Sequence, residues 1–108
     1  MARDGYIYII KEGGSSYYKI GVSKSSTYAR LKILQVGNPR KLEVILETAV
    51  SNYLELENEL HKYYKDLNIN GEWFILNEVL LKEIIKKIKA REKTNNIIIQ
   101  KRGDIKCL

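Results

Sequence analysis

Two short runs near the amino end of the chain, residues 5–10 and 17–21, are rich in the β-branched and aromatic residues that favour a pleated strand. The polar, glycine-containing segment between them supplies a flexible turn, so the pattern predicts an antiparallel hairpin. Because side chains alternate across a strand, Tyr6, Tyr8 and Ile10 are expected to share one face. The tyrosine hydroxyls of the first strand should therefore lie on the same side of the sheet.

The rest of the chain alternates between helical and extended patterns. Ser25, Ser26 and Thr27 offer N-caps for a helix that runs to about Val36 and is closed by Gly37. The pattern then predicts a strand at 41–50, a helix capped by Ser51 or Asn52 and running to about Leu67, a turn at 68–71, an extended segment at 72–76 and a helix from Asn77 to about Lys93. Residues 97–99 are expected either to add an edge strand or to pack on the sheet.

The third strand shows a simple alternation of side chains. On one face it is expected to carry Leu42, Val44, Leu46 and Thr48, and on the other Glu43, Ile45 and Glu47. The complete order of elements predicts an α/β protein of the α+β type, in which helices flank a small, mainly antiparallel, three-stranded sheet. A length of 108 residues indicates one domain, which we expect at 1–94, followed at 95–108 by the strand-like run and a basic tail.

Charge is distributed unevenly along this chain, whose formal net charge is +6. Residues 1–81 carry ten basic and ten acidic residues, whereas residues 82–108 carry nine basic and three acidic ones. A concentrated basic segment suits a polyanion such as DNA, and a solvated helix face is the alternative interpretation. The predicted phosphate contacts of this segment are Lys82, Lys86, Lys89, Lys101 and Arg102.

The sequence also excludes several classes of protein. A single cysteine, Cys107, excludes an internal disulfide and a cysteine-cluster metal site. No apolar stretch approaches the roughly 20 residues that a membrane span needs, and the amino end lacks the apolar run of a signal peptide. We therefore expect a soluble, intracellular protein that acts where DNA is handled, with no membrane partner.

A set of residues occurs in an order typical of one nuclease family. Tyr-Ile-Tyr at 6–8 and Lys-Ile-Gly at 19–21 stand where that family has Gly-Ile-Tyr and Tyr-Ile-Gly, and Arg30 stands nine residues past Gly21 on the first helix. Glu57 lies on a later helix. With these residues the chain resembles the GIY-YIG nuclease superfamily, in the branch found in bacteriophages and large DNA viruses.

Three further segments support the resemblance to that branch, which covers residues 5 to about 85. They are Glu-Asn-Glu-Leu-His at 57–61, Gly-Glu-Trp-Phe at 71–74 and Gln-Val-Gly-Asn-Pro at 35–39. The second motif carries Lys19, as is common in this branch. Many relatives have a histidine four residues after the arginine, whereas this chain has Leu34 there, so the group that protonates the leaving oxygen stays unassigned.

The resemblance implies a metal-dependent DNA endonuclease. In that reading Glu57 holds Mg²⁺ or Mn²⁺, which prefers oxygen ligands, and Arg30 binds the scissile phosphate through its planar fork of donors. Tyr8 would act as the general base or orient the water, and it needs a nearby cation because its reference pKa is about 10. Lys19 could supply that cation, bind the phosphate or position the water.

Other residues could support this site. Tyr6 shares the face of Tyr8, and His61, on the same helical face as Glu57, could carry a proton or hold the carboxylate in place. We expect Gly21 to let the strand and the substrate approach each other without a Cβ, and we expect Trp73 and Phe74 to give structural support. Further possibilities are a hydrogen bond of Glu72 to Arg30, Lys19 or the backbone, a site role for Tyr17 or Tyr18, and Glu55 or Glu59 as the acid in place of Glu57.

Two other classes of protein fit the same sequence. One is a nucleic-acid-binding module that keeps the fold without cutting, and the other is a structural protein whose basic helix binds a partner protein. A single small domain makes one active site, so cutting both strands requires a homodimer or two encounters with the DNA.

Overall fold

A computed structural model describes residues 4–24 and 27–92. Its elements are β1 (Gly5–Glu12), β2 (Tyr17–Ser23), α1 (Thr27–Val36), β3 (Leu42–Val50), α2 (Tyr53–Tyr63), a 3₁₀ turn (Lys65–Leu67), β4 (Asn68–Asn70), β5 (Trp73–Ile75) and α3 (Glu78–Lys89). The α+β class is confirmed. The prediction of three strands is wrong, because the antiparallel sheet has five strands in the order β3-β1-β2-β5-β4. β4 and β5 have only three residues each, which is too short for an alternation to be recognised.

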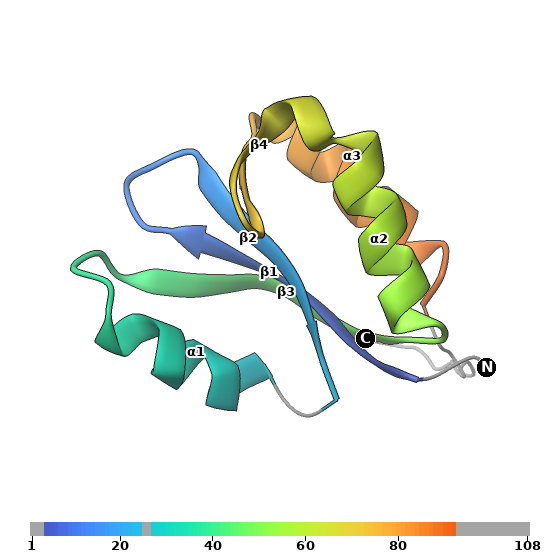
Figure 1. Ribbon diagram of the computed structural model, residues 1–108, viewed down its shortest axis with the longest axis horizontal. Helices are drawn as coiled ribbons and strands as arrows, with labels where there is room; N and C mark the ends of the chain where they lie inside the picture. The colour runs from blue at the N-terminus through green and yellow to red at the C-terminus, as the bar shows by residue number, and fades with distance from the viewer. Residues whose placement is uncertain (1–3, 25–26, 93–108) are drawn as a thin grey trace, which may run out of the picture.

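Helices cover both faces of the sheet. Figure 1 shows α1 on one side and the pair α2 and α3 on the other. The side chains of β1 follow this division, since Ile7 and Ile9 pack with the residues of α2 and α3, whereas Tyr8 and Ile10 pack toward α1. The predicted alternation along the first strand is therefore confirmed, and Tyr8 faces α1.

A β-bulge interrupts the pairing of β1 with β3. Ile9 lies opposite Leu46, but the next residue, Ile10, lies opposite Val44, so Ile45 is left over on β3. An extra residue in one strand reverses the faces of every side chain beyond it. The predicted single alternation along residues 41–50 is therefore wrong for the second half of the strand.

The bulge brings an acidic residue to the α1 face of the sheet. Residues directly opposite each other in an antiparallel pair point to the same face, and Glu47 lies opposite Tyr8 while Thr48 lies opposite Ile7. Leu46 accordingly packs with the core beneath α2 and α3 instead of with Leu42. Glu47 thus lies on the face of Tyr8, whereas a uniform alternation would have placed Leu46 and Thr48 there and Glu47 on the opposite face.

The ends of the later helices differ from the predictions. α2 stops at Tyr63 and gives way to the 3₁₀ turn, and α3 stops at Lys89 instead of continuing to Lys93. Asn77 caps α3 as predicted, since its side-chain oxygen accepts a hydrogen bond from the Leu80 amide at 2.8 Å. Asn52 instead adopts a left-handed conformation at φ 55° and makes no side-chain cap.

Residues 35–40 form a closed loop between α1 and β3. The Gln35 amide nitrogen donates to the carbonyls of Asn38 at 3.2 Å and Arg40 at 2.8 Å, and its oxygen accepts from the Leu42 amide at 2.8 Å. Asn38 in turn donates to Glu12 Oε2 at 3.1 Å and accepts from the Arg40 amide at 2.9 Å. The Gln-x-Gly-Asn-Pro segment therefore ties α1 to the start of β3 and to the end of β1.

Replacing Gln35 with alanine is expected to lower the free energy of unfolding by about 2 kcal/mol, since it removes three hydrogen bonds to a loop backbone. Urea denaturation measures this change. Val36→Ala is the matched control, because Val36 is the next residue on the helix and is 90% exposed. Equal midpoints for the two variants would show that the loop does not depend on the glutamine.

Some predictions lie outside the described residues. These are the strand or packed segment at 97–99, the boundary at 94 and the basic tail with Lys101 and Arg102. Among the helices that the structure describes, none has the length and apolar character needed to cross a membrane.

Candidate functional site

A cluster of polar side chains lies at an edge of β2. The pairing of β2 with β5 ends at Lys19, so the next residue, Ile20, takes its backbone partners from elsewhere. Its amide donates to the carbonyl of Glu72 at 3.0 Å, and its carbonyl accepts from His61 Nε2 at 2.9 Å. One residue of β2 thereby holds together the segment before β5 and the helix α2.

Tyr8 and Gly21 form the floor of this cluster. They lie opposite each other in the β1–β2 pair, and the Tyr8 side chain is almost completely buried. A Cβ atom on Gly21 would overlap the Tyr8 hydroxyl oxygen and would lie 2.8 Å from Glu72 Oε1. The absence of a side chain at Gly21 is therefore what lets the phenol and the Glu72 carboxylate reach the same place. The approach of substrate to the strand that the sequence predicted for Gly21 stays a prediction.

Lys19 is buried beside the cluster, on the same face of the sheet as Tyr8. Its Nζ lies 3.0 Å from Glu72 Oε1 and 5.6 Å from the centroid of the Trp73 ring. Of the three partners that the sequence left open for Glu72, the structure places Lys19 beside its carboxylate. The contact is an ion pair without a well-directed hydrogen bond, since Glu72 Oε1 is buried and has no hydrogen-bond partner of good geometry.

Glu57 reaches the same cluster from α2. Its Oε2 is buried, has no hydrogen-bond donor within the described residues and lies 3.9 Å from His61 Nε2. Burial raises the pKa of this carboxyl, and the nearby Glu72 charge raises it further, while His61 and Lys19 oppose the change. The site therefore holds two converging carboxylates that are only partly neutralised by Lys19.

The other two glutamates of α2 point elsewhere. Arg91 donates to Glu59 at 3.0 Å and to Glu55 at 3.3 Å, beyond the end of α3. Neither of them is available to the cluster at β2. Of the three candidate acids on this helix, the structure brings Glu57 alone to the side chains of Glu72 and Lys19.

The carboxylates fit a hard divalent cation. Glu57 and Glu72 each have a buried oxygen without a hydrogen-bond donor, and a cation between them would offset the repulsion that raises the Glu57 pKa. Within residues 4–24 and 27–92 there is no group of three or more His, Cys, Asp or Glu side chains suited to a metal. One or two carboxylates are nevertheless the usual protein ligands of Mg²⁺, with water and substrate phosphate completing the shell.

The remaining predicted residues are placed in different ways. Arg30 is the fourth residue of α1, and its side chain lies outside what the structure describes. Tyr6 shares the Tyr8 face, and its hydroxyl makes no hydrogen bond within the described residues. His61 donates to the Ile20 carbonyl and contacts the Phe74 ring edge-on at 4.9 Å, and Phe74 is fully buried as expected of a supporting residue.

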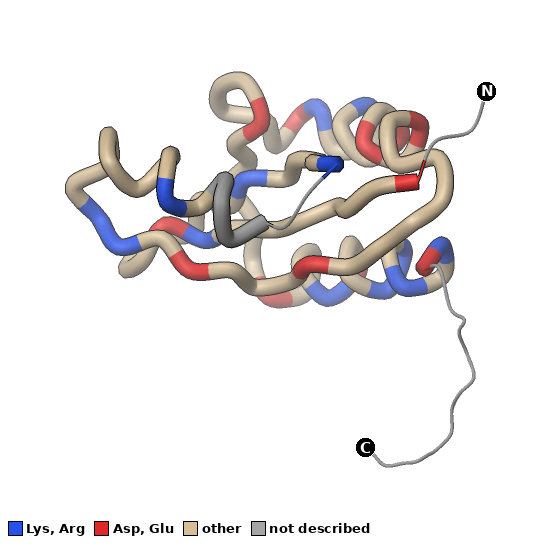
Figure 2. Tube along the Cα trace, turned by 90° about the horizontal axis from the view of Figure 1, so that it is seen from below, with Lys and Arg blue, Asp and Glu red and all other residues tan. Residues whose placement is uncertain are grey.

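The basic helix lies on the opposite face of the sheet from Tyr8. Its predicted phosphate-binding residues Lys82, Lys86 and Lys89 are exposed, and Figure 2 shows Lys and Arg positions along the helix that leads to the carboxyl end. The sheet therefore separates this helix from Tyr8 and Lys19, so a single polyanion would have to pass around the sheet edge to contact both.

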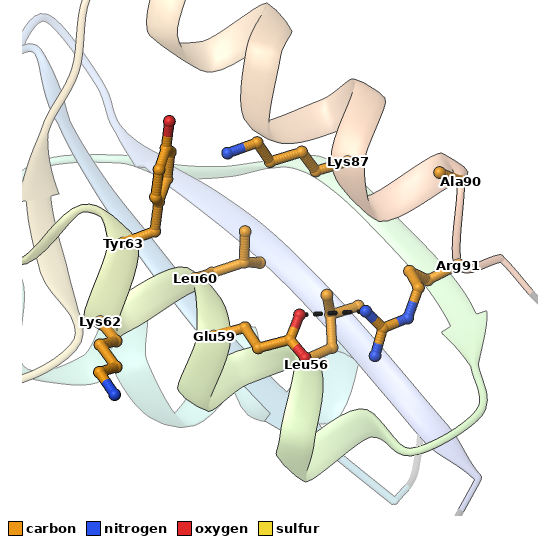
Figure 3. A pocket seen from close by; sticks show the side chains of 8 residues that line it. All are labelled: Leu56, Glu59, Leu60, Lys62, Tyr63, Lys87, Ala90 and Arg91. Carbon is orange, nitrogen blue, oxygen red and sulfur yellow. Dashed lines mark hydrogen bonds and ion pairs between the residues drawn. The ribbon is translucent and has the colours of Figure 1, made fainter.

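A groove of about 640 Å³ separates α2 from α3 and is shown in Figure 3. Leu56 and Leu60 form part of its lining, and two basic side chains cross it. Lys87 Nζ lies 3.3 Å from the centroid of the Tyr63 ring, and Arg91 binds the glutamates of α2. Unlike the exposed lysines of α3, these two cations already have partners within the protein.

The sequence did not identify Glu72 as a second acid, although it did suggest that Glu72 could pair with Lys19. It also gave no reason to place Glu47 with Tyr8. Glu72 directly follows Gly71, whose φ of 56° makes the tight turn between β4 and β5. A carboxylate at the end of such a turn, just before a strand, was the available signal for Glu72, whereas the position of Glu47 depends on the bulge.

An antiparallel sheet with helices on both faces, and with a phenol, an amine and two carboxylates at one strand edge, defines a small α+β domain with a polar cluster beside its sheet. The T5orf172 domain model matches residues 5–89, and the chain belongs to this family, which is phage-associated and linked to nuclease-type folds. No curated protein and no solved structure matches the chain significantly.

Proposed function

We propose that the chain is a metal-dependent DNA endonuclease of the GIY-YIG type. The observation that carries this proposal is the buried Glu57 oxygen, which has no donor among the described residues and lies close to Glu72 and Lys19. Glu72 in turn approaches the Tyr8 hydroxyl above Gly21. Such a group is costly for a protein that needs only a stable fold, because buried carboxylates that repel each other lower stability. Costly polar clusters of this kind are typical of functional sites.

Glu57 and Glu72 are the proposed ligands of Mg²⁺ or Mn²⁺. A bound divalent cation would stabilise the negative charge that develops on the phosphoryl oxygens during hydrolysis. Lys19 is fixed by its ion pair and adds a positive charge beside the same carboxylates. Because a lysine paired with a carboxylate is held in one geometry, Lys19 orients Glu72 as well as any phosphate that approaches.

The Tyr8 hydroxyl is the proposed group that orients the attacking water. It lies beside Glu72 at the floor of the site, where the missing side chain of Gly21 leaves room for it. Arg30 is the proposed phosphate clamp, since α1 covers the face of the sheet on which Tyr8 lies. His61, held by the Ile20 carbonyl, is the proposed positioning residue for Glu57.

Nicking of supercoiled DNA tests the proposal. The wild-type protein is expected to nick in the presence of Mg²⁺ or Mn²⁺, and Arg30→Ala and Glu57→Ala should each reduce the rate at least about a hundredfold by removing charge stabilisation of the transition state. Lys32→Ala is the matched control on α1, because Lys32 is an exposed cation near Arg30. The control should keep wild-type activity.

The same experiment separates the enzyme from a module that only binds nucleic acid. If the wild type and all three variants fail to nick but still bind DNA in a salt-dependent way, the endonuclease proposal is wrong and the binding module is correct. A rate of double-strand cleavage that depends on the square of the protein concentration would support cutting by two copies of the chain.

A further inference from the structure

A second cavity lies next to the proposed site, on the same face of the sheet. It has a volume of about 270 Å³ and is lined by Glu12, Tyr17, Asn38, Ile69, Asn70 and Trp73. Tyr17, Lys19 and Gly21 alternate along β2 and so point to the face on which Tyr8 lies. The cavity and the carboxylate cluster are thus neighbours along one strand.

Trp73 connects the cavity to the cluster. Its ring lines the cavity and also lies 5.6 Å from Lys19 Nζ, which in turn lies 3.0 Å from Glu72 Oε1. A phosphate beside Lys19 would therefore have the Trp73 ring directly next to it. The next chemical group along a nucleic acid strand from a phosphate is a sugar that carries a base.

The lining of the cavity suits a base better than a phosphate. Tyr17 and Trp73 supply aromatic rings, and the 42% exposure of Tyr17 leaves its ring accessible. Glu12 adds a negative charge, which is bound to Asn38 and lies 3.8 Å from Arg40, and none of the six lining residues is basic. An anion is therefore disfavoured, whereas a flat, uncharged ring can stack on the aromatic side chains.

A polar group is also available for the edge of a base. Asn70 lies opposite Trp73 in the β4–β5 pair, so the two side chains share a face. The Asn70 amide makes no hydrogen bond within the described residues, in contrast to Asn68, which donates to the carbonyls of Gly71 and Trp73. An amide can both donate to and accept from a base edge.

We propose that this cavity, which we call the base pocket, binds an unpaired nucleobase of the strand that is cut. The proposal rests on the proposed endonuclease function and deepens it by naming the substrate class, which is DNA with an unpaired nucleotide beside the scissile phosphate. In a continuous duplex the base is held in the stack and cannot enter a pocket unless it is flipped out, which has an energetic cost. Trp73 is thus a binding residue in addition to its structural role.

Trp73 is the only tryptophan of the chain, so its fluorescence reports on the base pocket without any catalysis. A single-stranded thymidine oligonucleotide, added in the presence of a chelator, is expected to quench Trp73 emission in a saturable way. An abasic oligonucleotide of the same length should not quench it, and a blunt duplex should quench it much less. All three probes have a DNA sugar–phosphate backbone, and they differ in whether they contain a base that is free to stack on a protein ring.

Two variants complete the test. Tyr17→Ala should raise the Kd of the thymidine oligonucleotide about tenfold by removing one stacking ring. Tyr63→Ala is the matched control, because Tyr63 is an exposed tyrosine in the separate groove between α2 and α3, and it should leave the Kd unchanged. Circular dichroism would verify that both variants are folded.

The outcomes distinguish this inference from the proposed function. Equal quenching by the abasic oligonucleotide or by the duplex would overturn the base pocket, as would an unchanged Kd in Tyr17→Ala, even if metal-dependent nicking is observed. Saturable quenching by the thymidine oligonucleotide without any nicking would support the base pocket and would instead overturn the endonuclease proposal.

Discussion

Replacing Gly21 with alanine is expected to abolish DNA nicking and to lower the free energy of unfolding by about 2 kcal/mol. The added Cβ would overlap the Tyr8 hydroxyl oxygen and would crowd Glu72 Oε1 at 2.8 Å. Tyr8 is buried and cannot move away without disturbing the core beside α1. The expected loss of activity therefore comes from displacement of the Tyr8 hydroxyl and the Glu72 carboxylate, since neither group is removed. Urea denaturation measures the change in stability, and nicking assays measure the loss of activity.

Gly37→Ala is the matched control for this prediction. Gly37 follows α1, its φ lies outside the positive range, and a Cβ added there meets no atom within 4 Å. The control should keep both stability and activity. If Gly21→Ala also behaves like the wild type, Tyr8 and Glu72 do not require the space above Gly21, and the proposed roles of both residues lose their structural basis.

Replacing Glu57 with glutamine is expected to raise the melting temperature, measured in a chelator at neutral pH, while it reduces nicking at least about a hundredfold. Burial and the charge of Glu72 raise the Glu57 pKa in the folded state above the ordinary value of a glutamate. The wild type therefore contains a charge whose burial is unfavourable, and glutamine removes that charge without changing the size of the side chain. A stabilised but inactive variant is the pattern expected of a functional site.

The stability difference between Glu57→Gln and the wild type is expected to change with pH in one direction. Because the folded state binds the Glu57 proton more tightly than the unfolded state does, the resulting stabilisation is complete below the unfolded-state pKa and is lost as the pH rises through the folded-state pKa. The stability advantage of Glu57→Gln should therefore grow as the pH rises over this range. Glu59→Gln is the control, since Glu59 is exposed and bound to Arg91. A stability difference between Glu57→Gln and the wild type that becomes smaller with rising pH would contradict the prediction.

The sequence predicted the parts of the fold that depend on strong local signals. The hairpin of β1 and β2, the helix α1 and the cap at Asn77 each have a pattern that repeats or a residue with one clear local role. β4 and β5 do not, because strands of three residues have no recognisable period and owe their pairing to the free edge of β2. The extra residue of the bulge, Ile45, also could not be predicted from the local sequence, since a bulge is defined only by the register with the neighbouring strand.

The residues of the candidate site likewise fall into those that the sequence predicted and those that it did not. Tyr8, Lys19 and Glu57 were recognised through the resemblance, and the structure brings all three side chains to one edge of β2 together with Glu72. The choice of Glu57 over Glu59 also followed from the resemblance, because helical geometry indicated only that the two cannot face the hairpin together. In the structure Glu59 is bound to Arg91. Glu72 and the base pocket depend on where β5 is placed beside β2, and no local pattern in the sequence encodes that placement.

The backbone bonds of Ile20 also affect how the protein behaves in solution. Beyond Lys19, β2 pairs with no strand on its outer side within the part of the chain that the structure describes, and an open strand edge favours pairing with another chain and so aggregation. The Glu72 carbonyl and the His61 ring occupy the exposed donor and acceptor of Ile20, so no foreign strand can pair with them. Residues of the proposed site thereby also block strand pairing at Ile20, which links the protection of this part of the sheet edge to the integrity of the site.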